Sequence, residues 1–264
     1  MNAARGMFAI GVFAVMALWE ILAPRRPIPF PRRVRWAANL GVGFASAFTA
    51  FILLPGGVAS IAAWGASRNL GLLRMDGLGG TPAYLLGIAA LDLSVMLQHM
   101  AFHNVGPLWR LHRIHHVEPA LDVSSGIRFH PAEVALSLAW KGIVVLALGI
   151  SPAAAASFEV LLNACSLFNH GNVAMPARFD RFIRLCLVTP DMHRVHHSVR
   201  FEERNSNFGF CLPWWDRMLG TYRADPAEGQ LGMELGILPG RLPEKSIEGM
   251  VDLLAAPFRK GRQT

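Results

Sequence analysis

The sequence repeats one short histidine-rich motif, and this repeat is the feature best suited to chemistry. "LHRIHHVEP" spans residues 111–119, and "MHRVHHSVR" spans residues 192–200. Each copy has three histidines at positions i, i+3 and i+4, which lie on one face of a helix. A further pair, His99 and His103, has the spacing i, i+4. Neutral imidazoles that converge from several helices are good ligands for first-row transition metals.

All ten histidines of the chain lie between residues 99 and 197. Two of them, His130 and His170, stand alone, and an isolated histidine is more often an ordinary polar residue than a ligand. The eight clustered histidines exceed the four ligands that close a zinc site, so two metals are the more economical interpretation. We therefore expect a two-metal site, with His130 and His170 as further ligands. The eight clustered ligands are His99, His103, His112, His115, His116, His193, His196 and His197.

Three other polar residues are candidates for supporting the ligands. Asp92 precedes His99 by seven residues and His103 by eleven, close to whole helical turns, so it shares their face. Metal-bound histidines usually donate their second N–H to such a group, so we expect Asp92 to orient a histidine; a polar contact between helices is the alternative. Asn205 and Asn207 follow the last motif closely, and they lie either beside the ligands or in a solvated turn.

The composition around these motifs indicates a membrane protein. Apolar residues make up 53% of the 264 residues and charged residues only 16%, which is unusual for a soluble domain. A helix needs about 20 apolar residues to cross the ~30 Å of hydrocarbon. Five stretches approach this length, at 7–23, 37–64, 81–98, 132–150 and 152–168. We expect the first to remain as an anchor rather than to be a removed signal peptide.

These elements predict an all-α integral membrane protein with about four to five transmembrane helices and a cytoplasmic helical cap that carries the metals. We treat residues 1–264 as a single domain. Residues 1–80 are then anchor helices, residues 81–223 the histidine-containing core, and residues 224–264 a C-terminal tail. Ile247, Met250, Val251 and Leu254 in this tail have helical spacing. The tail helix therefore lies either on a membrane surface or on the protein's own core.

Charge sets the expected orientation. The segment "PRRPIPFPRRVRW" (24–36) is rich in arginine, which the positive-inside rule assigns to the cytoplasm. The net charge of +7 then indicates contact with anionic headgroups rather than with nucleic acid. From a cytoplasmic 24–36 loop, the next predicted helix runs outward and the one after it returns. The first histidine motif, which follows that returning helix, therefore lies on the cytoplasmic side. A hairpin of 132–150 and 152–168 crosses out and back, so the second motif can join the first.

Two ionisable residues lie inside the predicted hairpin. Lys141 lies ten residues before the turn near residue 151 and Glu159 eight residues after it, so they are nearly level on antiparallel helices. A charge in hydrocarbon usually needs a partner. We therefore expect a Lys141–Glu159 contact. The cysteines Cys165, Cys186 and Cys211 have no C-x-x-C spacing, and we expect free thiols.

The order of the motifs resembles that of a known family. H-x-x-x-H, H-x-x-H-H and H-x-x-H-H occur with "RFHPAE" (128–133), "NHGN" (169–172), "TPDMHRVHHS" (189–198), "NSNFGF" (205–210) and "WWDRMLGTY" (214–222). This pattern, over residues 85–223, is similar to that of the fatty acid hydroxylase and sterol desaturase superfamily of integral-membrane di-iron enzymes. The resemblance implies two iron ions that use O2 to hydroxylate or desaturate an unactivated C–H bond of a membrane lipid, such as a sterol or a fatty-acyl lipid. Zinc is redox-inert, so we would regard zinc in a purified sample as a substitute for iron.

Such a reaction needs electrons from elsewhere. This sequence has no G-x-G-x-x-G, no haem C-x-x-C-H and no iron–sulfur cysteine set. We therefore expect an external ferredoxin-like or cytochrome b5-like donor, and a location in a bacterial cytoplasmic membrane. A non-catalytic or transport-related membrane metal-binding protein is the alternative. A membrane zinc peptidase would normally contain H-E-x-x-H, which is absent.

Overall fold

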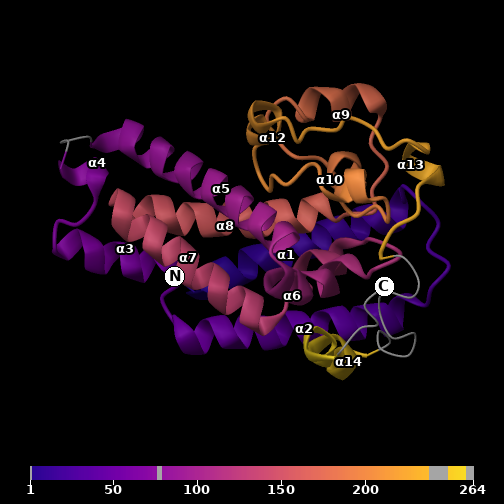
Figure 1. Cartoon of the computed structure of the whole chain (residues 1–264), viewed down its shortest axis with the longest axis horizontal. Helices are drawn as coiled ribbons and strands as arrows, with labels where there is room; N and C mark the ends of the chain where they lie inside the picture. Colours follow the sequence, from indigo (N-terminus) through magenta and orange to yellow (C-terminus); the bar gives the residue numbers. More distant parts are fainter. Residues whose placement is uncertain (1, 76–78, 238–248, 260–264) are drawn as a thin grey trace.

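The computed structural model describes residues 2–75, 79–237 and 249–259, and it is helical throughout its regular elements. Long helices run along the molecule's long axis, and short helices form a cap at one end (Figure 1). The helices of this bundle are α1 (Asn2–Leu22), α2 (Arg32–Leu53), the shorter α3 (Val58–Ser67), α5 (Gly80–Asn104), α7 (Pro131–Leu148) and α8 (Pro152–Asn169). The short α-helices at the cap end are α6 (Gly106–His116), α9 (Ala177–Ile183), α10 (Pro190–His196), α11 (Phe201–Arg204), α12 (Trp214–Leu219) and α13 (Gly229–Gly232). The remaining helices are α4 (Leu72–Met75), α14 (Met250–Ala255), and the 3-10 turns η1 (Val123–Ile127) and η2 (Ala256–Phe258).

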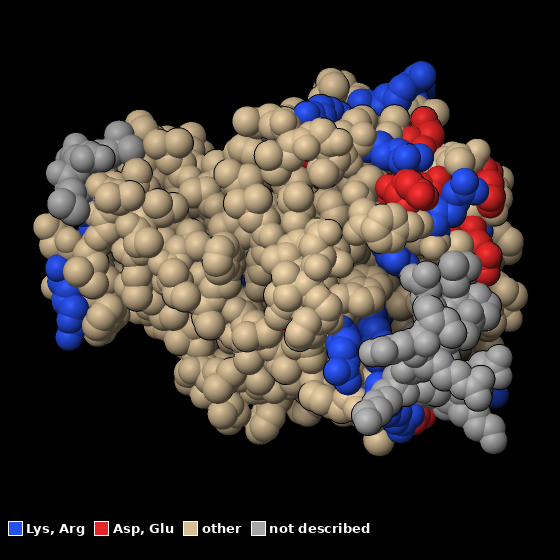
Figure 2. Space-filling model, in the orientation of Figure 1, with Lys and Arg blue, Asp and Glu red and all other residues tan. Residues whose placement is uncertain are grey.

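Four segments are long and apolar enough to cross a membrane, which confirms the predicted all-α membrane fold. They are Arg5–Leu22, Arg32–Ser67, Gly80–Asn104 and Pro131–Leu148. The surface agrees with this assignment, because Figure 2 shows a broad uncharged region over the long helices and most charged side chains over the cap end. The fifth predicted stretch forms α8, which packs against α1, α3 and α5 inside the bundle.

The second hydrophobic stretch differs from the expectation, because it forms two helices. α2 ends at Leu53 and α3 begins at Val58. Pro55 lacks a backbone N–H, and Gly57 has a φ of 66°, a left-handed conformation that glycine tolerates best. The sequence "PGG" at 55–57 therefore breaks the helix inside the bundle.

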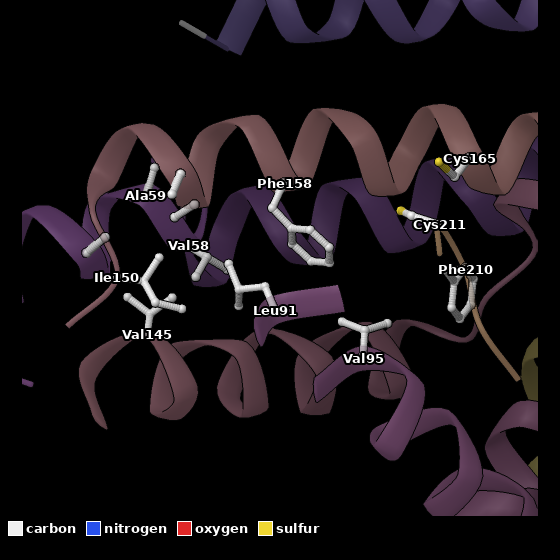
Figure 3. Packing of buried hydrophobic residues seen from close by; sticks show 13 residues of the cluster. Val58, Ala59, Leu91, Val95, Val145, Ile150, Phe158, Cys165, Phe210 and Cys211 are labelled. Carbon is white, nitrogen blue, oxygen red and sulfur yellow. The ribbon is translucent and has the colours of Figure 1, made fainter. Parts of the chain in front are cut away.

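The predicted hairpin forms, but its two arms are kept apart. Gly149, with a φ of 71°, ends α7, and Ser151 caps α8 by accepting a hydrogen bond from the backbone N–H of Ala154. α3 and α5 each pack against both α7 and α8. Figure 3 shows the apolar side chains that fill the space between these helices, including Leu91 and Phe158.

This separation explains why the expected Lys141–Glu159 contact is wrong. The Glu159 carboxylate forms an ion pair with Arg5 of α1 at 2.9 Å. It also accepts a hydrogen bond of 3.0 Å from the backbone N–H of Val58, at the start of α3. Lys141 and Glu159 both lie in the described part of the chain, and they form no ion pair with each other. Glu159 thus stabilises the helix break and leaves the hairpin register to apolar packing.

The described part of the C-terminal tail packs on the protein's own core. Met250, Leu253 and Leu254 join a cluster with Val42 of α2 and Ile114 of α6. Val251 points away from this cluster and is 76% exposed. Ile247, the first apolar residue of the predicted tail helix, lies outside the described residues.

Candidate metal centre

Nine of the ten histidines converge where four helices meet at the cap end. α5 contributes His99 and His103 near its C-terminus, and α6 contributes three more. α6 begins directly after α5 because Pro107 in its first turn has no N–H for a continuous helix. His170 ends α8, and α10 with its C-terminal cap supplies the last three, after an N-cap at Thr189.

The nine side chains form two groups. The five-histidine group consists of His99, His103, His112, His116 and His196. The four-histidine group consists of His115, His170, His193 and His197. Within each group, one ring nitrogen per residue lies within 4.8 Å of every other.

Several nitrogens of the five-histidine group are at the spacing of ligands on one metal. The Nε2 atom of His112 lies 3.0 Å from that of His99 and 3.2 Å from that of His116. The Nε2 atoms of His99 and His196 are 3.1 Å apart. Two nitrogens at about 2.0–2.2 Å from a metal, separated by an angle of about 90–110°, are themselves about 2.8–3.6 Å apart. A metal ion therefore fits between these atoms.

The four-histidine group has the same spacing. The Nε2 atom of His170 lies 2.9 Å from that of His115 and 3.2 Å from that of His193. The Nε2 atoms of His193 and His197 are 3.3 Å apart. The two groups adjoin, because the rings of His116 and His197 stack with their centroids 4.4 Å apart. Two metals held here would be close neighbours.

The opposite ring nitrogen, Nδ1, is fixed in five of the nine residues by a backbone carbonyl or a carboxylate. Donation from Nδ1 fixes the tautomer and leaves the Nε2 lone pair free for a metal. The contacts are His99 to Phe208 O (2.8 Å), His112 to Glu133 Oε1 (2.7 Å), His115 to Arg128 O (3.3 Å), His170 to Ser166 O (2.6 Å) and His196 to Ser206 O (2.8 Å).

His103 supplies a further sign that the site fits a metal. Both of its ring nitrogens are buried and have no hydrogen-bond partner among the described residues. Buried polar atoms in proteins are almost always satisfied, so this ring needs a partner. A metal in the five-histidine group would supply one.

Burial keeps these histidines neutral. It lowers the pKa of His115, His116 and His197 well below the usual histidine range, and neighbouring imidazoles lower it further. Burial lowers the pKa of His170 to about 4 and that of His196 to about 3. At neutral pH these rings therefore carry free lone pairs, the form that binds metals.

His130, predicted as a further ligand, is not brought to either group. Its Nδ1 accepts a hydrogen bond of 3.0 Å from the backbone N–H of Ala132 and so caps α7. Its Nε2 lies 3.2 Å from the carbonyl oxygen of Leu254. Because Pro131 starts α7 directly after it, His130 acts as a helix cap.

Asp92 does not orient a histidine directly, contrary to the sequence-based expectation. Within the described residues it hydrogen-bonds to no histidine, and it accepts from the backbone N–H of Leu212 (3.1 Å) and the indole Nε1–H of Trp215 (2.9 Å). The same loop carries Phe208, whose carbonyl accepts from His99. Asp92 therefore acts on His99 indirectly, because it holds the loop whose Phe208 carbonyl accepts from that histidine.

The two candidate asparagines have different environments. Asn205 is partly exposed, and its side chain donates to the carbonyl of Phe201. Asn207 is buried, with a φ of 51°, and its amide donates to the carbonyls of Met192 (2.9 Å) and Arg223 (2.8 Å). Asn207 thus ties α10, next to His193, to the following loop, whereas the side chain of Asn205 hydrogen-bonds within its own turn.

Sequence reasoning missed Glu133. This residue lies in the first turn of α7, and its carboxylate is 2.7 Å from the Nδ1 atom of His112. The signal was present, because an acidic residue in the apolar stretch 132–150 is unusual and belongs to the "RFHPAE" motif. The backbone carbonyls that hold four other histidines have no such signal, because every residue carries one.

Comparison with known proteins agrees with this geometry. The sequence profile of the fatty acid hydroxylase family matches residues 84–221. The chain is 31% identical over 180 residues to an ornithine lipid hydroxylase of Rhizobium tropici, a match that covers 68% of this chain and 51% of that protein. It is 28% identical to alkylglycerol monooxygenases of Danio rerio, over 52% of this chain and 30% of the relative, and of Homo sapiens, over 48% and 27%. The chain thus spans about half the length of the first relative and less of the others. No solved structure matches it.

The two groups predict separable metal sites. His99→Ala/His112→Ala leaves three histidines in the five-histidine group, and His170→Ala/His193→Ala leaves two in the four-histidine group. The parent should bind about two metal ions per chain, and each double variant about one. A site normally needs four ligands, and the altered group no longer has them. Elemental analysis of folded, purified protein measures this. His130→Ala is the matched control and should keep both metals; an equal loss in that variant would contradict the assignment.

The Glu133–His112 contact predicts a graded loss of affinity. Glu133→Ala removes the group that accepts the His112 Nδ1–H, so we expect metal affinity to fall about 10–100-fold. Glu133→Gln keeps an acceptor and should lose less. Competition with a chelator measures both, and Asn205→Ala, which alters only a contact with Phe201, should bind like the parent. Unchanged affinity in Glu133→Ala would show that the contact does not support the ligand.

Proposed function

Because the chain belongs to the fatty acid hydroxylase family, we propose that it is a membrane-bound di-iron enzyme that uses O2 to hydroxylate an unactivated C–H bond of a lipid. The observation that carries this proposal is the pair of adjoining groups, in which nine histidines face one another beneath an apolar bundle. Side chains alone cannot oxidise such a bond, so a redox metal is needed.

Iron suits the donor set. Neutral imidazoles bind iron readily, and the described groups supply five and four of them. Two irons bound there would use O2, two electrons and two protons to place one oxygen atom in the C–H bond and release the other as water. The protein's own part is to hold nine ligands at fixed spacing.

The residues around the ligands exclude water. The ring of Phe129 stacks on His115 with centroids 4.4 Å apart, and Phe208 and Phe210 lie 5.6 Å and 5.1 Å from the ring of His99. His103 is the least buried of the nine ligands, and Trp109 covers it at 5.1 Å. The site therefore comes nearest to the surface beside His103 and Trp109. An enclosed site of this kind protects reactive species from side reactions with water.

The relatives support a lipid substrate. One is named an ornithine lipid hydroxylase and the others alkylglycerol monooxygenases, so each name describes oxygen insertion into a lipid. These names favour hydroxylation over desaturation for this chain. The four apolar spans would bring the site to such a substrate within the membrane.

We also propose that the histidine end faces the cytoplasm and receives electrons there from an external donor. The arginine-rich segment 24–36 lies at this end, since Arg25 pairs with Asp191 of α10 at 3.0 Å. Arg26 donates to the carbonyl of Met233, 2.8 Å away. The positive-inside rule assigns such a segment to the cytoplasm, where a ferredoxin-like or cytochrome b5-like protein can dock.

Lipid analysis tests the function directly. Membranes of a bacterial host that expresses the chain should contain a lipid heavier by about 16 Da, one added oxygen atom, than the same lipid in the empty host. His99→Ala/His112→Ala should abolish the new species, while Asn205→Ala should retain it. A species lighter by about 2 Da would indicate desaturation instead. A folded, iron-loaded protein that changes no lipid in the presence of an electron donor would favour a non-catalytic metal-binding role.

A further inference from the structure

Two short cap helices, together with the turn that follows α9, expose large apolar side chains. We call this surface the α9–α12 face, and its large exposed residues are Phe179, Phe182, Leu185, Trp214, Met218 and Leu219. Phe182 is 72% exposed and Met218 75%. The two helices are fixed to each other, because the indole of Trp214 donates to the carbonyl of Leu185 at 2.6 Å. Apolar patches on a rigid surface usually mark an interaction site.

The α9–α12 face exposes positive charges, while its acidic residues are buried. Each of the two helices has one acidic residue, and both, Asp180 and Asp216, are buried. Asp180 pairs with Arg184, and Asp216 accepts from the backbone N–H groups of Phe208 and Gly209. The arginines Arg178, Arg181 and Arg217 remain exposed. Figure 2 shows basic side chains along the upper edge of the molecule, where α9 lies. The face is therefore apolar and positive.

The position of the face relative to the spans points to a membrane. Trp215 of α12 donates to Asp92, in the middle of α5. Asp92 lies twelve residues before Asn104, the last residue of α5, which is about 18 Å along the helix. α12 is thus attached beside the span, so the exposed side chains of the face lie next to the lipid that would surround α5.

We infer that the α9–α12 face lies in the headgroup boundary of the leaflet on the cap side and binds anionic phospholipid there. The apolar side chains enter the upper acyl region, and the arginines meet the phosphates. The face rests on the membrane fold and not on the proposed reaction, so it holds even if the chain oxidises no lipid. One consequence concerns the site: Asp216 of α12 accepts from the backbone N–H of Phe208, whose carbonyl holds His99, so the face is linked to the histidines.

Cys186 provides a native reporter for this inference. It is exposed and adjoins Leu185, whereas Cys165 and Cys211 are buried, so a thiol-reactive fluorophore labels it selectively. The full chain is placed in nanodiscs, one copy per disc, made of phosphatidylcholine with or without phosphatidylglycerol. We expect nitroxide-bearing lipids to quench the label, and acrylamide in the water to quench it weakly. The phosphatidylglycerol discs should give the stronger lipid quenching.

Variants separate the two parts of the face. Three variants, Arg178→Gln, Arg181→Gln and Arg217→Gln, remove one positive charge each. Each should lower the binding of the face to phosphatidylglycerol, relative to phosphatidylcholine, about fivefold, because one arginine near an anionic surface strengthens binding by about that factor. Arg200→Gln is the matched control, an exposed cap arginine outside the face. Phe182→Ser with Met218→Ser should expose the label to acrylamide, while Leu231→Ser, also exposed in the cap, should not.

Three results would overturn the inference. Acrylamide could quench the label in single-copy discs as fully as it quenches the free fluorophore in water. Protection could require two copies in one disc, which would make the face a dimer interface. It could also require an added electron-transfer protein, which would make the face a protein docking site.

Discussion

The structure depends on one constraint: nine imidazoles, eight of them in buried residues, have their nitrogens turned toward one another. The Nε2 atoms of His115 and His170 are 2.9 Å apart, yet each neutral ring donates its proton from Nδ1 to a carbonyl, so neither Nε2 has a proton to share. A buried polar atom without a partner is costly. A cation between them would relieve this cost, because it would accept all of these lone pairs. Metal binding would therefore be coupled to correct folding of the cap, as it is in proteins whose metal sites organise their surroundings.

A buried polar network keeps the histidines in place. Arg128 donates to Glu118, at 2.9 Å, and to the carbonyl of His115, at 3.1 Å. Glu118 in turn pairs with Arg35 of α2 at 2.8 Å. A buried ion pair adds little net stability, but it specifies one arrangement over others. This network fixes α6 against α2, so the first histidine motif has a single register relative to the bundle.

The sequence predicted the parts of this arrangement that are periodic. Spacing of i, i+3 and i+4 suffices to place His112, His115 and His116 on one side of a short helix. It fails where tertiary packing decides: the "PGG" break at 55–57 inserts α3 between the hairpin arms, and Glu159 turns to Arg5 instead of Lys141. His130 sits before a proline and becomes a cap. The backbone carbonyls that accept from the histidines, such as that of Phe208, could not be predicted, because residues of every type carry one.

The central claim is that the histidines form two separate, adjoining metal sites. Anomalous diffraction at the iron edge from crystals of the iron-loaded chain tests it most directly. The account predicts two peaks, one at about 2.0–2.2 Å from nitrogens of the five-histidine group and one at the same distance from those of the four-histidine group. A single peak shared by both groups, or iron bound away from them, would contradict it.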